Sequence, residues 1–244
     1  MTAPRIVIVE DADEIGRVGA GLVTDTIARS PAASITAATG ESPMGLYSAL
    51  AAHYRSGMLE TSAVTVFQLD EYLGLAPGDR RSLLGWMRRS FLEPLGVSDE
   101  RVIPLLPDGD PEEACAAFDR AIEAHGRLDI AILGLGRNGH LGFNEPPSAP
   151  QSPTRVVELS AVTLEDNARY WGSMADVPAK AVTMGLRQLL GARQIVMVVS
   201  GAIKRAIVHR ALDGPVGPEV PASFLRTAEA DVTVIVDRAA WGDG

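Results

Sequence analysis

The sequence predicts an α/β domain with a mainly parallel sheet and helices on both faces. Short apolar runs that favour β structure alternate with amphipathic stretches of helical period, the pattern of strands buried on both faces. The chain has 244 residues, 46% of them hydrophobic, which is enough for one sizeable core and short for two. No repeat, low-complexity tract or linker-like run divides it, so we expect a single domain over residues 1–244.

The expected strands are the short apolar runs, from RIVIVE near the N-terminus to DVTVIVD near the C-terminus. They cover residues 5–10, 33–40, 63–70, 101–106, 128–134, 154–160, 194–201 and 231–237. Helices are expected between them, and several end at Gly or Pro, where the chain must turn. They cover residues 12–29, 43–57, 82–94, 111–125, 162–171, 183–191 and 203–213. The Pro- and Gly-rich segment 214–223 is expected to be a surface loop.

Composition and charge narrow the classes of partner. The net charge of -9 argues against binding nucleic acid, because that requires clustered Lys and Arg. The first residues do not resemble a secretory signal and no stretch is apolar for long enough to span a bilayer, so we expect a cytoplasmic protein that binds no membrane. Cys115, the only cysteine, shares a helical face with Phe118 and Ile122 and is expected to be a core thiol.

Unusual polar residues come directly after apolar strands, at 39–42, 70–71, 136–145 and 200–204. In open α/β sheets the carboxyl ends of the strands line the ligand crevice. We therefore expect these four segments, which are distant in sequence, to form one site.

The first segment, AATGESPMG, looks like a phosphate-binding loop. A strand leads into a Gly turn, and Pro43 suits the first turn of a helix, which leaves the backbone N–H groups of that turn free for an anion. We expect Thr39, Gly40 and Ser42 to bind phosphate. The alternative is that Ser42 only caps the helix. The Lys-Ser/Thr ending of a Walker A loop is absent.

The second segment, FQLDEYLGL, ends a strand in two carboxylates between Leu69 and Tyr72. A carboxylate held against apolar groups has a raised pKa and can carry a proton between adjacent carbons. Asp70 is our candidate base. The alternative is a solvated pair of charges at a strand end.

The third segment, LDIAILGLGRNGHLGFNEPP, contains GxGxxG at 134–139, but a dinucleotide site needs a helix to begin there, and tandem Pro after several Gly disfavours one. The glycines instead allow Asn138, His140 and Glu145 to converge. A carboxylate beside a histidine fixes its tautomer and raises its basicity, so His140 is a candidate for moving a proton onto a sugar ring oxygen.

Two cations complete the expected site. Lys204 lies just past a strand, and Arg169 lies in the helical segment EDNARYW; both suit a terminal phosphate, with surface charge as the alternative. No metal-ligand motif is present, so we expect catalysis without a metal or organic cofactor. The segment 159–182 follows the densest polar cluster and is expected to be a mobile lid.

Together these stretches resemble the glucosamine-6-phosphate deaminase family, which is grouped with sugar-phosphate isomerases and 6-phosphogluconolactonases. The similarity runs from Ile35 to Val236 and is most specific in LDEY, GRNGHLGFNEP, VTMG and VSGAIK. The resemblance implies a modified doubly wound, Rossmann-like sheet. It also implies conversion of glucosamine 6-phosphate to fructose 6-phosphate and ammonia.

The resemblance gives each candidate a role. Asp70 matches the base that moves a proton between C2 and C1, and His140 matches the ring-opening histidine with Glu145 and Asn138 as its partners. The phosphate-binding set is matched by Thr39, Gly40, Ser42, Arg169 and Lys204.

Three positions depart from the family pattern. Glu41 stands in the phosphate loop where small uncharged residues are usual, and Leu83 replaces a common Tyr. Arg155 is kept, but Val157 replaces a Lys typical of members activated by an acetylated amino-sugar phosphate, so we expect weak or absent allostery.

Two other functions stay open at this point, a 6-phosphogluconolactonase-type hydrolase and a non-catalytic sugar-phosphate sensor. The stretches LDEY and FNEP disfavour the first, and the intact set of Asp70, His140 and Glu145 disfavours the second. The residues do not distinguish glucosamine from galactosamine, and they leave open whether the chain forms a homo-oligomer.

Overall fold

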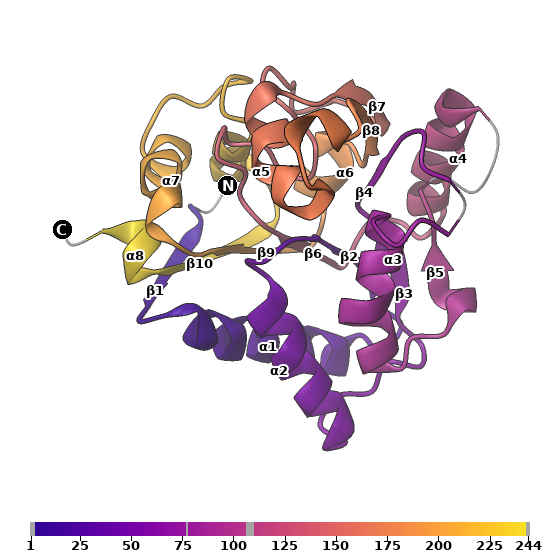
Figure 1. Ribbon diagram of the computed structural model, residues 1–244. Coiled ribbons are helices and arrows are strands. Elements are labelled where there is room, and N and C mark those ends of the chain that lie inside the picture. The colour runs from indigo at the N-terminus through magenta and orange to yellow at the C-terminus, as the bar shows by residue number, and fades with distance from the viewer. Residues whose placement is uncertain (1–2, 77, 106–109, 243–244) are drawn as a thin grey trace.

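The main sheet of this computed structural model has seven strands within the described residues, which are 3–76, 78–105 and 110–242 (Figure 1). The strands are β1 Arg5–Val9, β2 Ser34–Ala37, β3 Thr65–Gln68, β5 Val102–Ile103, β6 Ile130–Leu133, β9 Gln194–Val199 and β10 Asp231–Asp237. Their order is β1-β10-β9-β6-β2-β3-β5, and neighbouring strands run parallel. The predicted parallel sheet is confirmed. Residue 106, the end of one expected strand, lies outside the described residues.

The order in which the chain adds strands to this sheet predicts the position of a ligand crevice. From β2 the chain adds β3 and β5 on one side, and it then returns to add β6, β9 and β10 on the other. The strand order thus reverses between β2 and β6. In doubly wound sheets such a switch point opens a crevice at the carboxyl ends of the strands.

A second, antiparallel sheet is absent from the sequence prediction. It consists of β4 Asp70–Tyr72, β8 Lys180–Thr183 and β7 Arg155–Glu158. The expected strand 63–70 therefore ends early, because from Asp70 onward the backbone pairs with β8 and leaves the main sheet. The prediction that 154–160 belongs to the parallel sheet is wrong, and the helix expected from residue 183 begins only at Leu186, after β8.

Helices cover both faces of the main sheet, as predicted. On one face lie α1 (Ala12–Arg29) and α2 (Met44–Arg55), and on the other lie α4 (Pro111–Ala124) and α7 (Arg205–Leu212) (Figure 1). Ile15 and Leu46 belong to one buried cluster with Ile35 of β2, and Phe118 and Ile207 belong to another. No helix in the described part of the chain is long and apolar enough to cross a membrane. The helices are α1 Ala12–Arg29, α2 Met44–Arg55, α3 Leu83–Met87, α4 Pro111–Ala124, α5 Ala161–Trp171, α6 Leu186–Leu190, α7 Arg205–Leu212 and α8 Arg238–Trp241.

The predictions for Cys115 and for the segment 214–223 have different outcomes. Cys115 is buried in α4 beside Phe118, and burial raises the pKa of its thiol to about 11, so the predicted core thiol is confirmed. The predicted surface loop 214–223 is wrong at its end, where the 3-10 helix Pro221–Thr227 begins and its first residues are buried. The N–H of Ala222 donates to the carbonyl of Gly139 at 2.9 Å, so this segment packs behind the glycine turn.

Candidate active site

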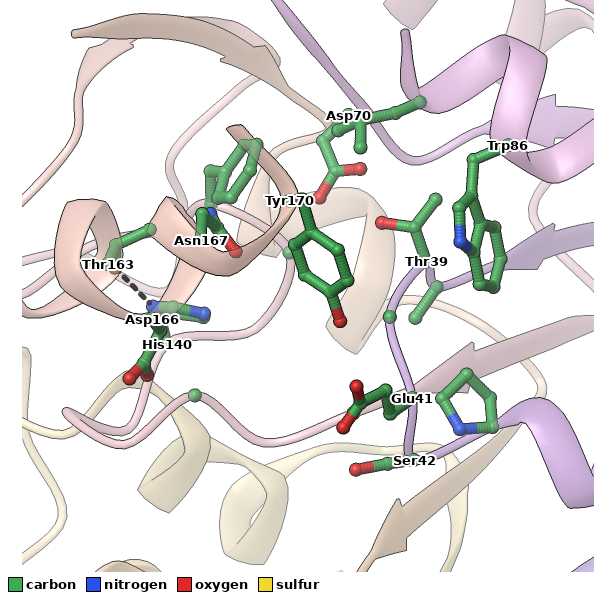
Figure 2. A pocket seen from close by; sticks show the side chains of 18 of the residues that line it. Thr39, Glu41, Ser42, Asp70, Trp86, His140, Thr163, Asp166, Asn167 and Tyr170 are labelled. Atoms are coloured by element: carbon green, nitrogen blue, oxygen red, sulfur yellow. Dashed lines mark hydrogen bonds between the residues drawn. The ribbon is translucent and has the colours of Figure 1, made fainter. Parts of the chain in front are cut away.

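A cavity of about 660 Å³ lies at the carboxyl ends of β2, β3, β6 and β9, where all four predicted segments meet. Figure 2 shows side chains from the first three of these segments facing a common space, with α5 along one side. Most of the predicted site residues line it, namely Thr39, Gly40, Ser42, Asp70, His140, Arg169 and Lys204. The remaining two, Asn138 and Glu145, lie behind His140 and contact it from there.

The loop after β2 forms the wall opposite α5. Gly40 has φ of 101°, a left-handed conformation that a residue with a Cβ rarely adopts. The hydroxyl of Tyr47 donates to the carbonyl of Ala38 at 2.6 Å and fixes the start of the loop. No side chain caps α2, whose N-cap position is Pro43, so Ser42 does not serve as the helix cap. Its hydroxyl faces the cavity instead (Figure 2).

Asp70 is a buried carboxyl group on the first residue of β4. Only 4% of the residue is exposed, and among the described residues its Oδ1 has no hydrogen-bond partner. Burial, followed by the negative charge of Glu71, raises the pKa of Asp70 to about 8. The alternative of a solvated pair of charges is therefore wrong, since both carboxylates are buried.

Glu71 differs from its neighbour because its carboxylate is fully occupied. Oε1 accepts hydrogen bonds from the N–H groups of Tyr72 and Leu83, both at 2.9 Å. Oε2 accepts from the N–H of Leu84 and from Nε2 of Gln68, both at 3.0 Å. Glu71 thus holds the start of α3 against β4, and Asp70 is the carboxyl of the pair that is available for chemistry.

His140 lies in a polar cluster on the loop after β6. Its Nδ1 lies 3.6 Å from Oε2 of Glu145, which also accepts from Nδ2 of Asn138 at 2.6 Å. Burial alone would raise the pKa of Glu145, but hydrogen bonds and charge from His140, with Thr163 and Asn138, lower it to about 2. The carboxylate is therefore ionised beside the imidazole at neutral pH.

The glycines around His140 make room for it. A Cβ on Gly136 would lie 2.3 Å from Nε2 of the imidazole, so the ring packs directly on the backbone. No helix begins in the described loop between β6 and β7, which leaves the GxGxxG stretch without the helix that a dinucleotide site needs.

The second sheet joins the base to this loop through Thr183. Thr183 pairs with Asp70 in the sheet register, and its hydroxyl accepts the N–H of Phe143 at 3.0 Å. Thr183 is completely buried. One residue thus contacts both the strand that carries Asp70 and the loop that carries His140.

The two predicted phosphate-binding cations approach the loop from different elements. The Nζ of Lys204 donates to the carbonyl of Leu135 at 2.7 Å. Burial lowers the pKa of Lys204, and the positive charges of Arg137 and Arg169 act in the same direction while Asp166 opposes them. Both Arg169 and Lys204 line the cavity. The guanidinium of Arg169 pairs with Glu41 at 2.9 Å.

The sequence prediction includes Arg169 of α5 but misses the other contributions of that helix and those of the segment before α3. Thr163 of α5 lies 3.3 Å from Nδ1 of His140, and Arg137 holds α5 through Glu165 and Asp166 at 2.7 and 2.6 Å. The guanidinium of Arg81 lies 4.3 Å from the ring centre of Trp171. These residues carry no local signal, since α5 reaches the cavity through the second sheet. Among the described residues no cluster of His, Cys, Asp and Glu is placed to hold a metal ion.

Comparisons with known proteins agree with this geometry. The family model described as glucosamine-6-phosphate isomerases/6-phosphogluconolactonase matches residues 11–234. Glucosamine-6-phosphate deaminase of Bacillus velezensis is 40% identical over 235 residues, which is 95% of this chain and 96% of that protein. The protein of the same name from Streptomyces coelicolor is 39% identical over 240 residues, 97% of this chain and 91% of that protein.

Solved structures give the same fold. A monomeric glucosamine-6-phosphate deaminase has a TM-score of 0.93 and 34% identity, covering 97% of this chain and 98% of its own. The 6-phosphogluconolactonase from Trypanosoma brucei has a TM-score of 0.78 at 19% identity, covering 98% of both chains, a likeness of fold alone. The chain therefore belongs to the family of glucosamine-6-phosphate isomerases and 6-phosphogluconolactonases.

Proposed function

We propose that the protein is a glucosamine-6-phosphate deaminase, which converts glucosamine 6-phosphate and water to fructose 6-phosphate and ammonia. The observation that carries the proposal is Asp70, a buried carboxyl with an unpartnered oxygen that lines the same cavity as His140. Deaminases of this name that match almost the whole chain at 39% and 40% identity support it.

The proposed reaction begins with ring opening. His140 gives a proton to the ring oxygen of the sugar while the C1 hydroxyl releases its proton to water, so the bond between C1 and the ring oxygen breaks and the C1 aldehyde forms. The ionised Glu145 stabilises the imidazolium form, and Asn138 fixes Glu145 through the hydrogen bond at 2.6 Å.

Asp70 then moves a proton between adjacent carbons. Its carboxylate removes the C2 proton to give an enolamine and returns that proton to C1, which leaves an imine at C2. Water adds to the imine, ammonia leaves, and the ketone of fructose 6-phosphate forms. With a pKa of about 8, Asp70 is basic enough to accept a carbon-bound proton and acidic enough to release it near neutral pH.

The phosphate group occupies the loop end of the cavity in this proposal. The loop residues Thr39, Gly40 and Ser42 line that end, and Arg169 and Lys204 supply two positive charges. Helix N-termini and Arg forks are the protein groups best suited to a phosphate. A phosphorylated sugar as substrate also supports a cytoplasmic location.

In the same proposal the segment 159–182 acts as a lid within a single domain as far as residue 179, whereas its last residues, 180–182, lie in β8 and pair with β4 and β7. It contains α5, in which Thr163 and Trp171 are buried, Trp171 packs against Tyr72, and ion pairs of Arg137 and Arg169 join the helix to the cavity walls. Ion pairs at a surface are easily broken and remade, which suits an element that opens for substrate.

The test is ammonia release by the purified protein from glucosamine 6-phosphate and, separately, from galactosamine 6-phosphate. We expect equal amounts of ammonia and ketose phosphate from glucosamine 6-phosphate. Asp70→Asn should reduce turnover by at least about 100-fold because it removes the base, and it should still bind inorganic phosphate in calorimetry. Hydrolysis of 6-phosphogluconolactone without ammonia release would identify a lactonase, and binding without any product would identify a sensor.

A further inference from the structure

Glu41 places a carboxylate inside the proposed phosphate subsite. It lies on the loop between Gly40 and Ser42, two of the residues proposed to contact the phosphate, and it lines the cavity itself. Figure 2 shows its side chain beside Ser42, below the ring of Tyr170. A negative group at this position repels a phosphate unless its charge is balanced.

The charge of Glu41 is balanced by Arg169, the cation that the proposed function assigns to phosphate. Oε2 of Glu41 lies 2.9 Å from Nη1 of Arg169, and the two residues are 128 positions apart in sequence. The guanidinium carbon of Arg169 also lies 4.7 Å from the centre of the Tyr170 ring. In the free protein the anion partner of Arg169 is thus already present as a side chain.

The other cations near the phosphate are partly or fully engaged by the protein itself. Lys204 donates to the carbonyl of Leu135, and Arg137 is engaged by Glu165 and Asp166. A phosphate that enters must therefore share Arg169 with Glu41 or displace that carboxylate, which in either case remains on the adjacent backbone. Both effects oppose binding.

We propose that Glu41 is an affinity-setting residue that acts as an internal competitor for the phosphate group of the substrate. This inference rests on the proposed function for the identity of the substrate, but not for the presence of an anion site. The consequence is a weaker Michaelis complex than the loop would form with a small uncharged residue at position 41.

The test compares Glu41→Ser and Glu41→Gln with the unmodified protein. Both sides of the pair are more than half exposed, at 66% for Glu41 and 56% for Arg169, so the pair is weak and the expected effect is moderate. We expect KM for glucosamine 6-phosphate to fall about two- to fivefold in both variants, with kcat within about twofold of the original. The dissociation constant of inorganic phosphate should fall by a similar factor.

Ionic strength gives a second readout. Salt screens both the ion pair between Glu41 and Arg169 and the repulsion between Glu41 and the phosphate, because the Debye length falls from about 10 Å at 0.1 M to about 3 Å at 1 M. The difference in KM between the original protein and Glu41→Ser should therefore shrink as salt is raised. A purely steric effect of the longer side chain would persist at high salt, and Glu41→Gln would then resemble the original protein.

Glu10→Gln is the matched control. Glu10 pairs with Arg238 at 2.8 Å with similar exposure, 72% and 62%, and neither residue lines the cavity. This variant should leave KM unchanged. Unchanged or higher KM in both Glu41 variants, with unchanged phosphate affinity, would overturn the inference. If the protein releases no ammonia, the proposed function fails, and phosphate calorimetry still tests Glu41 by itself.

Discussion

Asp70 and Glu71 are adjacent and both buried, yet their hydrogen bonding differs. Four donors surround the carboxylate of Glu71, whereas Oδ1 of Asp70 has no partner among the described residues. The sequence identifies the pair as acidic groups at a strand end. It cannot choose between them, because the deciding N–H groups belong to Leu83 and Leu84, 12 and 13 positions from Glu71.

The burial of Asp70 makes the free energy of unfolding depend on pH. Because folding raises its pKa from 3.8 to about 8, the favourable contribution of the neutral group is complete below pH 3.8 and is lost as pH rises through about 8. Asp70→Asn stays neutral throughout. We therefore expect this variant to gain stability over the original protein between about pH 4 and pH 8, by a few kcal/mol at most.

Urea unfolding at pH 5 and pH 8 measures this gain. The stability difference between Asp70→Asn and the original protein should be larger at pH 8. Asp25→Asn, at an exposed position of α1, should give the same small difference at both pH values. An equal difference for Asp70→Asn at both pH values would show that Asp70 is ionised over the whole range.

Glu71 also acts on the scale of elements, because it fastens α3 to β4. Its carboxylate accepts the free N–H groups of the first turn of α3, next to the cap formed by Ser82. Segments of α3 and the residues before it line the cavity, so this junction fixes part of the wall. The same charge contributes to the raised pKa of Asp70, after burial.

Glu71→Gln should therefore change the pH dependence of activity. Removing the charge lowers the pKa of Asp70, so the acidic limb of kcat/KM should move to lower pH. The variant should also lose about 1–3 kcal/mol of stability, because an amide cannot accept all four hydrogen bonds. Measurement of kcat/KM from pH 5 to pH 9 detects the shift.

Ser82→Ala is the control for that experiment. It removes the hydrogen bond from the N–H of Gly85 at 3.0 Å and loosens the same helix start without changing charge. The acidic limb of its kcat/KM profile should lie at the same pH as in the original protein. If Glu71→Gln and Ser82→Ala behave alike, Glu71 has a structural role only.

At the scale of the whole molecule, the sequence predicts what depends on local pattern. The parallel strands, the helices on both faces and the four polar segments at the strand ends follow from periodicity and from the crevice rule. The second sheet does not, because β4 and β8 are short and pair across more than 100 residues, from Asp70 to Thr183. On α5 the sequence predicts Arg169, a cation that suits phosphate, but not Thr163 or Tyr170, which line the cavity because the second sheet positions the helix.

The expected lack of allosteric activation is also a property of the whole molecule. Arg155 of β7 directs Nη1 to Asn144 at 2.7 Å and Nη2 to Ser148 at 2.8 Å, so its guanidinium is already engaged within the protein. Val157 carries no charge to assist it. We expect hyperbolic kinetics and a flat response of ammonia release to an acetylated amino-sugar phosphate. Sigmoidal kinetics that this ligand relieves would contradict the expectation.

Thr183 links the two reacting groups by a short route through buried backbone. It pairs with Asp70 in the small sheet and holds the N–H of Phe143, three residues after His140. Any rigid displacement of the small sheet therefore carries the carboxyl and the imidazole together. The distance between the two groups that exchange protons with the sugar in the proposed reaction is thus set by the small sheet as well as by the loops that leave β3 and β6.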